Sequence, residues 1–414
     1  MNILVLSDRY PPFYEGGYEL NCQLVVDALR ARGHTMTVLT TTFGVPSRRV
    51  EGHVHRALHS TDYPYRGRLH RRISQIRQFV WAWQNAARTR RLAETVQPDL
   101  AFVWHMLGTS LPPILTVQDA GIRTVYRVES HWLVQLKEWL ADEPRLSRRQ
   151  FRAALIGFCR FDELALDRLI FVSHSLKREY QRAGFHVPDA PVIPTGLPPE
   201  WLALPRGPHP ARDGILRLVF VGRLESNKGT DIAVEAVRRV VNEYTCRNVS
   251  LDLIGRGEPA YIDHLRAFIA QENLEEYVRL RGFVLRKELV AEYASYDVLL
   301  FTTPAREGLG MTILEAMSQG LLVIASDIGG PQDIITDHQD GWLVPPGDPG
   351  ALAAAIIEAA RQPELVRQLG SAATQTIRAK HTFDAMLDAY EICLQAACRP
   401  REVSASELVS GEIA

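Results

Sequence analysis

The sequence predicts an α/β protein built from two domains, each a doubly wound parallel sheet. The chain has 414 residues, more than one hydrophobic core of ordinary size accommodates. Short apolar runs of the strand type alternate with helical patterns along almost all of it. The alternation stops at a stretch with five prolines, residues 198–210, and then begins again, which is typical of a linker between two similar domains.

The first domain is expected over residues 1–205, with the linker at its end. A helical pattern closed by Gly33 separates the first two strands, and this βαβ unit carries the pair Gly16-Gly17 in its first crossover. The pair favours a helix start that faces the carboxyl edge of the sheet, although an ordinary turn would also use two glycines. The expected strands are 2–7, 35–40, 99–104, 124–128 and 169–172.

The second domain is expected over residues 211–380. A helix over 381–398 is expected to pack back toward the first domain, and residues 399–414 are expected to form a flexible tail. Helical patterns cover 230–241, 349–378 and 384–398. The expected strands are 216–221, 250–254, 278–280, 298–301, 322–325 and 342–344.

The charge of the chain is unevenly distributed. The net charge is only −1, which gives no support to a role in binding nucleic acid. Residues 1–205 hold 26 Lys and Arg against 19 Asp and Glu, a net +7, and the remainder carries a net −8. The two halves are therefore expected to meet different partners.

The cysteines and the apolar segments predict where the protein works. Five scattered cysteines form no CxxC or Cys/His ligand spacing, which favours reduced thiols. The amino terminus leads directly into a strand, and no apolar run approaches 18 residues. We expect a cytoplasmic protein, with peripheral contact at the inner face of the membrane left open.

That contact is suggested by residues 66–91, where arginines without any acidic neighbour alternate with apolar and tryptophan residues. A basic amphipathic helix of this kind can lie on an anionic membrane surface. The alternative is a helix whose apolar stripe packs on the sheet. The arginines are Arg66, Arg68, Arg71, Arg72, Arg77, Arg88, Arg90 and Arg91.

The most informative stretch of the second half runs from Glu307 to Glu315. Glu307 lies in a strand-to-helix loop, and Glu315 lies about two turns into the helix. Because the first N–H groups of a helix are unpaired, such a corner suits an anion, and Gly310 permits close approach. The carboxylates suit hydroxyl groups. Together they predict a sugar-nucleotide site, the alternative being a helix start with two solvated acids.

Two cations belong to the same predicted edge. Arg223 and Lys228 lie in the loop that follows the first strand of the second domain. In a doubly wound sheet this loop and the Glu307 loop open onto the same edge. Two cations and a helix N-terminus around one crevice would hold a diphosphate.

Taken together, these motifs make the chain resemble glycosyltransferase family 4. The E-x7-E spacing of Glu307 and Glu315 matches the motif of that family, and the resemblance extends from Asn2 to about residue 395. It implies a GT-B fold, in which two Rossmann-like domains face a central cleft. The further matching segments are Gly16-Gly17-Tyr18-Glu19, Arg32-Gly33-His34, 171–175, Gly222-Arg223-Leu224, Lys228-Gly229, and Gly329-Gly330 with Asp333.

The resemblance also implies a role for each matching residue. Glu307 would bind hydroxyls of the donor sugar, Glu315 would bind the ribose, and Arg223 and Lys228 would neutralise the departing diphosphate. The remaining substrate contacts implied by the resemblance are the backbone of Gly310, Met311 and Thr312 at the phosphate or sugar, Gly255, Arg256 and Val284 at the nucleoside, and Gly16 and Gly17 at the diphosphate or the acceptor.

One loop departs from the family pattern. Many relatives carry His-Asp just after the fourth strand, whereas this chain has Glu129-Ser130-His131-Trp132. If Trp132 sets the register, Glu129 takes the usual His place. If the strand ends later, His131 takes it, and we favour His131 as the residue near the sugar.

The resemblance implies a retaining hexosyltransferase that needs no metal or other cofactor. It would move a hexose or N-acetylhexosamine from a nucleotide-diphosphate sugar, by front-face displacement, to a glycan, lipid-linked or small-molecule acceptor, as in polysaccharide biosynthesis. Two alternatives remain open: a GT-B sugar-nucleotide epimerase, against which the E-x7-E motif argues, and a catalytically weak sugar-nucleotide-binding regulator.

Overall fold

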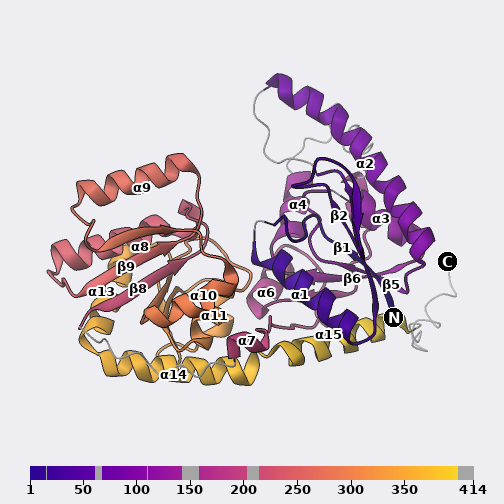
Figure 1. Cartoon of the computed structure of the whole chain (residues 1–414). Coiled ribbons are helices and arrows are strands. Elements are labelled where there is room, and N and C mark those ends of the chain that lie inside the picture. The colour runs from indigo at the N-terminus through magenta and orange to yellow at the C-terminus, as the bar shows by residue number, and fades with distance from the viewer. Residues whose placement is uncertain (15, 61–67, 110, 142–157, 203–213, 400–414) are drawn as a thin grey trace. The chain divides into compact units, whose positions relative to one another are not determined.

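The computed structural model describes every residue except 15, 61–67, 110, 142–157, 203–213 and 400–414 (Figure 1). The chain forms two compact units. Unit 1 contains Met1–Ile170, Phe185–Pro191 and Leu387–Ala414. Unit 2 contains Phe171–Gly184 and Val192–Met386. Of the expected tail, all but Arg399 lies outside the described residues.

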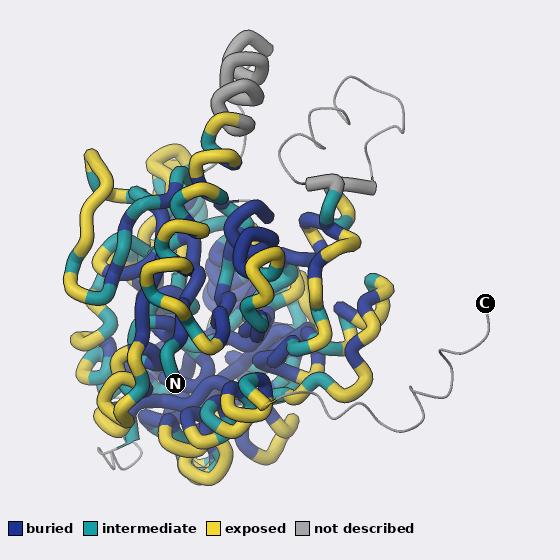
Figure 2. The backbone as a smooth tube through the Cα atoms, turned by 90° about the vertical axis from the view of Figure 1, so that its right-hand side faces the viewer, coloured by how far each residue is buried: buried dark blue, intermediate teal, exposed yellow. Residues whose placement is uncertain are grey.

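Unit 1 is built on a seven-stranded sheet in the order β3-β4-β2-β1-β5-β6-β7. The pair β3 and β4 is antiparallel, whereas β1, β2, β4, β5 and β6 pair in parallel. The strands are β1 (Asn2–Leu6), β2 (Thr35–Thr41), β3 (Arg49–Glu51), β4 (Val54–Leu58), β5 (Leu100–Val103), β6 (Arg123–Val128) and β7 (Leu169–Phe171). The strands β1, β2 and β5 are almost entirely buried, whereas β3 is exposed at Arg49 and Val50. Figure 2 shows buried backbone in the interior and exposed backbone around it.

The helices of unit 1 pack along this sheet. At the end of α1, Arg32 forms ion pairs of 2.7 and 2.6 Å with Asp388 and Glu391 of the C-terminal helix α15. Tyr390 of α15 meets the ring of Phe102 on β5 at 5.9 Å, so this part of α15 belongs to the core of unit 1. The helices are α1 (Gly17–Ala31), α2 (Arg68–Val96), α3 (Pro112–Asp119), α4 (Trp132–Ala141), the short 3₁₀ segment η1 (Phe158–Glu163) and α15 (Phe383–Cys398) from Leu387 on.

Unit 2 is built on a six-stranded parallel sheet in the order β10-β9-β8-β11-β12-β13. The order reverses beside β8, so the crossover connections run in opposite directions from that strand, as in a doubly wound sheet. The strands are β8 (Leu216–Val221), β9 (Val249–Ile254), β10 (Val278–Gly282), β11 (Val298–Phe301), β12 (Leu322–Ser326) and β13 (Trp342–Val344).

Helices cover both faces of the second sheet. On β11 and β12, Val298, Leu300, Leu322 and Ile324 share one hydrophobic cluster with α8 and α13, because alternate side chains of a strand point to one face. The helices are α6 (His174–Arg182), α7 (Pro199–Leu202), α8 (Thr230–Arg238), α9 (Pro259–Gln271), α10 (Arg286–Glu292), α11 (Met311–Ser318), α12 (Pro331–Ile334), α13 (Pro349–Arg361) and α14 (Pro363–Lys380), with the short turns η2 (Ser226–Lys228), η3 (Arg239–Glu243) and η4 (Tyr293–Ser295).

The division between the units differs from the boundary expected at 205–211. Residues 171–184 and the chain from Val192 belong to unit 2 because long-range hydrogen bonds hold them there. Ser173 Oγ donates to the carbonyl of Gly308 at 2.6 Å, and Gln319 donates to the carbonyl of Trp201 at 2.8 Å. The proline-rich composition of 198–210 marked a break in the strand pattern, and part of it is helix α7.

Other expectations differ only in detail. β3 and β4 were not expected, and the helix expected over 349–378 is interrupted at Gln362, because Pro363 begins a new helix. No helix of the described residues is long and apolar enough to cross a membrane. The described cysteines Cys22, Cys246, Cys393 and Cys398 are all free.

Candidate functional site

The Glu307 loop of unit 2 joins β11 to α11. Gly310 precedes the helix with a φ of 100°, a left-handed conformation that favours glycine. The carboxylate of Glu307 accepts a hydrogen bond from the ammonium group of Lys228, and both side chains are partly exposed. The structure therefore brings together two of the residues that the sequence predicted to act on one substrate.

The loop that carries Lys228 is fixed to the end of β11. Gly229 has a φ of 71°, and a Cβ there would overlap the backbone of Thr302. Thr302 Oγ1 donates to the carbonyl of Gly229 at 2.7 Å, and Thr303 Oγ1 donates to that of Asn227 at 3.1 Å. These bonds fix the backbone on both sides of Lys228 to the end of β11, and the Lys228 side chain reaches Glu307, 79 positions away along the chain.

The pair Gly329-Gly330 packs directly against the backbone of the Glu307 loop. The N–H of Gly330 donates to the carbonyl of Glu307 at 2.8 Å. A Cβ on Gly329 would lie 2.6 Å from that carbonyl oxygen, and a Cβ on Gly330 would overlap the backbone of Leu309. Only residues without a side chain allow this close approach.

The loops after β8, β9 and β10 place the other predicted residues of unit 2. Arg223 is half exposed and pairs with Glu225 at 2.8 Å. Gly255 packs against the backbone of Gly222, where a Cβ would overlap, so the β8 and β9 loops lie side by side. The guanidinium of Arg256 lies 4.0 Å from the centroid of the Phe283 ring, and Val284 is the next residue.

Glu315 has a partner that the sequence did not predict. Its side chain is almost fully buried in α11, and Arg286 Nε at the start of α10 donates to Oε1 at 2.7 Å. Burial raises the pKa of Glu315 above its ordinary value, and the charge and hydrogen bond of Arg286 oppose the rise. Arg286 also lies 5.7 Å from the ring of Trp201. No local pattern marks Arg286, since the pairing joins positions 29 apart.

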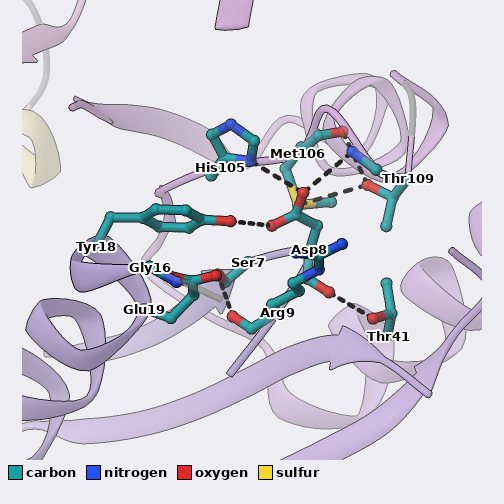
Figure 3. Close-up of polar contacts among 11 residues, drawn as sticks. Ser7, Asp8, Arg9, Gly16, Tyr18, Glu19, Thr41, His105, Met106 and Thr109 are labelled. Carbon is teal, nitrogen blue, oxygen red and sulfur yellow. Dashed lines mark hydrogen bonds and ion pairs between the residues drawn. The ribbon is translucent and has the colours of Figure 1, made fainter. Parts of the chain in front are cut away.

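Unit 1 contains a polar cluster that the sequence did not predict (Figure 3). It surrounds Asp8, which follows β1 and is buried. The carboxylate accepts hydrogen bonds from Tyr18 Oη at 3.1 Å, His105 Nδ1 at 2.9 Å and the N–H of Gly108 at 3.0 Å. Burial raises the pKa of Asp8, but the interactions with His105 and Gly108 outweigh it and leave the pKa below its ordinary value.

The predicted glycines Gly16 and Gly17 stand next to this cluster along the chain. Gly17 begins α1, and Gly16 precedes it in an extended conformation. The N–H of Gly16 donates to the buried carboxylate of Glu19 at 3.0 Å, which fixes the helix start. Tyr18, whose hydroxyl reaches Asp8, lies in the first turn of the same helix.

The loop between β6 and α4 contains the two candidates for the usual histidine position. β6 ends at Val128 and α4 begins at Trp132, so Glu129 and His131 share one short loop. Glu129 accepts hydrogen bonds from Asn21 at 2.8 Å and from the buried Arg127 at 3.0 Å. His131 is partly exposed and its carbonyl caps α4 through Gln135. Glu129 is thus engaged with Asn21 and Arg127, and His131 stays the residue predicted to lie near the sugar.

The site residues of unit 2 share one edge of its sheet. The loops after β8, β9, β10 and β11 all leave the carboxyl ends of parallel strands, where ligands of doubly wound sheets bind. The edge combines the ammonium group of Lys228, a carboxylate at Glu307 and the first turn of α11. In the described part of the chain, no group of three or more His, Cys, Asp or Glu side chains is arranged to hold a metal ion.

Comparison with protein families identifies the class. A model described as Glycosyltransferase Family 4 matches residues 16–201, and a model described as Glycosyl transferases group 1 matches residues 216–362. Together they cover most of both units. The chain belongs to the group 1, family 4 glycosyltransferases and has the GT-B fold of two Rossmann-like domains, which confirms the resemblance seen in the motifs.

Individual relatives agree with this assignment. The amylovoran biosynthesis glycosyltransferase AmsK of Erwinia amylovora is 33% identical over 147 residues, 34% of this chain and only 35% of that protein. The uncharacterized glycosyltransferase MJ1607 of Methanocaldococcus jannaschii is 24% identical over 376 residues, 86% of this chain and 88% of that protein. HepE of Anabaena, solved with UDP and glucose, has a TM-score of 0.70 at 20% identity and covers 96% of this chain and 100% of that structure. At 20% identity, the similarity to HepE shows the fold alone.

Proposed function

We propose that the protein is a retaining, metal-independent hexosyltransferase that uses a nucleotide-diphosphate sugar. The observation that carries the proposal is the pair formed by Lys228 and Glu307 beside the first turn of α11. A cation and unpaired helix N–H groups suit the diphosphate, and a carboxylate suits the sugar hydroxyls. One edge of unit 2 thus offers what a sugar nucleotide requires.

In the proposed reaction the diphosphate leaves the anomeric carbon as the acceptor hydroxyl approaches from the same face, so that the configuration is retained. Lys228 and Arg223 stabilise the negative charge that develops on the diphosphate. In the structure each of them pairs with a glutamate, Glu307 and Glu225 respectively. The diphosphate replaces Glu307 as the partner of Lys228, which frees Glu307 for the sugar.

Two of these relatives guide the choice of substrates. HepE was solved with UDP and glucose, and AmsK acts in the biosynthesis of amylovoran. We therefore propose UDP-hexoses as the first donors to test, followed by GDP- and ADP-sugars, and a glycan or lipid-linked acceptor of polysaccharide biosynthesis. An N-acetylhexosamine donor and a small-molecule acceptor remain within the same proposal.

The test begins with binding of UDP-, GDP- and ADP-sugars, followed by the rate of sugar release or transfer from the donor that binds. Lys228→Ala and Glu307→Ala should each lower that rate by about 100-fold or more, because each removes a charged contact to the reacting group. Lys380→Ala, which removes an exposed lysine at the end of α14, is the matched control and should leave the rate unchanged. Near-normal turnover in either site variant contradicts the assignment. Tight binding of a donor with no turnover would instead favour a sugar-nucleotide-binding regulator.

The metal requirement is a separate prediction. Because Lys228 and Arg223 supply the positive charge that a divalent cation supplies in other sugar-nucleotide enzymes, EDTA should leave the rate unchanged. The measurement compares the rate of sugar release in about 1 mM Mg²⁺ with the rate in excess EDTA. Strict dependence on Mg²⁺ or Mn²⁺ would show that the cationic side chains are not sufficient.

A further inference from the structure

The ion pair of Lys228 and Glu307 engages both of the groups that the proposed donor requires. The ammonium group would bind the diphosphate and the carboxylate would bind the sugar hydroxyls, yet in the structure each group has the other as its partner. Both residues belong to unit 2. A donor must therefore separate two opposite charges that already attract each other.

The backbone around each member of the pair is fixed independently of the pair. Hydroxyl groups of Thr302 and Thr303 hold the chain on both sides of Lys228. The N–H of Gly330 donates to the carbonyl of Glu307 at 2.8 Å. The side chains of Lys228 and Glu307 are 27% and 25% exposed, so water screens their attraction only in part. Because only side-chain freedom is lost when the pair forms, we expect it to re-form readily whenever no ligand is bound.

The other predicted cation of the donor edge is held less firmly. Arg223 pairs with Glu225 at 2.8 Å, but the arginine side chain is 52% exposed and its partner lies two residues away in the same loop. Ion pairs as accessible as this one contribute little. Lys228 is therefore the cation for which a ligand must compete with a carboxylate of the protein.

This competition distinguishes a sugar nucleotide from the nucleoside diphosphate that remains after transfer. A sugar nucleotide offers both groups a new partner, because its phosphates pair with Lys228 and its hydroxyls donate to Glu307. A nucleoside diphosphate offers a partner to Lys228 alone. It leaves the carboxylate of Glu307 without its cation and close to a phosphate of like charge, which is the unfavourable way to open an ion pair.

We propose that the Lys228–Glu307 pair expels the spent nucleoside diphosphate, by re-forming in place of the contact between Lys228 and the phosphate once the sugar has left. This inference rests on the proposed function and concerns the regulation of the same site: Glu307 weakens product binding in addition to contacting the sugar. Because product release limits the turnover of many enzymes, this competition keeps the site available for the next donor. Both groups lie in unit 2, so the exchange of partners takes place within one unit.

Glu307→Gln tests the proposal, because the two roles of Glu307 predict opposite changes. The amide has nearly the shape of the carboxylate, so the loop and the first turn of α11 should stay in place, but Lys228 is no longer neutralised. In calorimetric titrations with UDP, GDP and ADP, Glu307→Gln should bind the nucleoside diphosphate about fivefold or more tightly than the wild type. Sugar release from the matching nucleotide sugar should nevertheless be slower, and the nucleoside diphosphate should inhibit it more strongly.

A double-mutant cycle assigns the gain in affinity to the pair. In a Lys228→Met background, Glu307→Gln should change the affinity for the nucleoside diphosphate by less than about twofold, because no cation remains to be freed. The matched control is Glu258→Gln, which removes an exposed glutamate from the loop after β9 at the same edge of the sheet. It should also change the affinity by less than about twofold. An equal gain in Glu258→Gln would mean that loss of any nearby negative charge is sufficient, which overturns the proposal.

The remaining outcomes separate this inference from the proposed function. If Glu307→Gln binds the nucleoside diphosphate no more tightly than the wild type, while sugar release is still slowed, Glu307 is a sugar contact alone and the expulsion of product is wrong. If neither the wild type nor Glu307→Gln binds UDP, GDP or ADP, the proposed function itself is refuted.

Discussion

At the scale of single residues, the candidate site depends on how burial and a nearby cation together set the pKa of a buried carboxylate. Glu315 is 3% exposed, and its pKa is raised by burial although Arg286 opposes the rise. A carboxylate accepts hydrogen bonds from ribose hydroxyls with both oxygens, whereas the protonated acid has lost part of that capacity. Arg286 acts in the same direction on Glu315 as His105 and Gly108 act on Asp8, but burial prevails at Glu315 and raises its pKa, whereas the partners prevail at Asp8 and lower its pKa.

This comparison predicts a change in the pH dependence of donor binding. Acidification through the raised pKa of Glu315 protonates it, so the affinity for the nucleoside diphosphate should fall as pH drops. Removing a nearby cation raises the pKa of a carboxylate further. In Arg286→Met the loss of affinity should therefore begin at higher pH than in the wild type, and affinity at pH 7 should drop about tenfold or more. The measurement is calorimetric titration of the nucleoside diphosphate between about pH 5 and 8.

The matched control is Arg279→Met, which removes an exposed arginine from the adjacent strand β10. Arg286→Lys should restore part of the wild-type profile, because it returns the charge without the fork of donors. If Arg286→Met binds the diphosphate with the wild-type pH dependence, Arg286 is a packing residue of the Trp201 contact and has no part in nucleoside binding.

At the scale of elements, glycines set the position of the Glu307 loop. The loop rests on Gly329, whose φ of 71° and close contact with the Glu307 carbonyl are two separate reasons for glycine. Gly347 has a nearly equal φ of 75°, but a Cβ there would meet nothing within 4 Å. Alanine variants at the two positions should therefore share the free-energy cost of a left-handed backbone, and only the variant at Gly329 should also displace Glu307.

We expect Gly329→Ala to weaken binding of the nucleoside diphosphate and to slow sugar release, whereas Gly347→Ala should affect stability only. The left-handed conformation costs about 1–2 kcal/mol in either variant. The overlap with Glu307 adds about 1–3 kcal/mol in Gly329→Ala alone. Thermal unfolding and diphosphate titration of both variants measure the two effects. Equal binding by the two variants would mean that the Glu307 loop shifts without consequence for the donor.

At the scale of the whole molecule, both sheets could be predicted because their central strands are nearly continuous apolar runs, typical of parallel strands buried on both faces. β3 and β4 escaped notice because they are short and contain polar residues. One of these, Arg56 of β4, is fully buried and donates to the carbonyl of Tyr10 at 3.0 Å. From the sequence alone, an arginine is expected at the surface, because the distant carbonyl that accepts its hydrogen bond cannot be foreseen.

The candidate site, like the fold, was predictable where its signals are local in the sequence. Glu307, Lys228 and Glu315 were found because the E-x7-E spacing and the glycines beside them are local signals. Arg286 and the dyad of Asp8 with His105 were missed, since their chemistry arises only when residues 29 and 97 positions apart meet. The division of the chain was missed for the same reason, because the bond from Ser173 to Gly308 joins distant segments.

The distribution of charge over the chain bears on the remaining prediction, contact with a membrane. The net +7 of residues 1–205 includes the arginines of α2. The described part of this helix packs through Ala82, Asn85, Thr89 and Ala93, which are buried at helical spacing. Trp83 is 70% exposed and Val80 is 44% exposed, so these apolar side chains are not used for packing. Arg66 lies outside the described residues, as do the side chains at 68–79.

We propose that α2 binds anionic membrane surfaces, where arginines meet lipid phosphates and Trp83 enters the interface. Binding to vesicles containing phosphatidylglycerol should exceed binding to phosphatidylcholine vesicles and should weaken as salt rises from about 0.01 to 0.15 M, because the Debye length falls from about 30 to about 8 Å. Trp83→Ser should weaken binding about tenfold or more, since burying a large apolar side chain stabilises by about 1.5–3 kcal/mol. Tyr244→Ser, which removes an exposed aromatic ring from unit 2, should not. If the wild type leaves anionic vesicles unbound even at low salt, the arginines of α2 are a solvated surface and the membrane proposal is wrong.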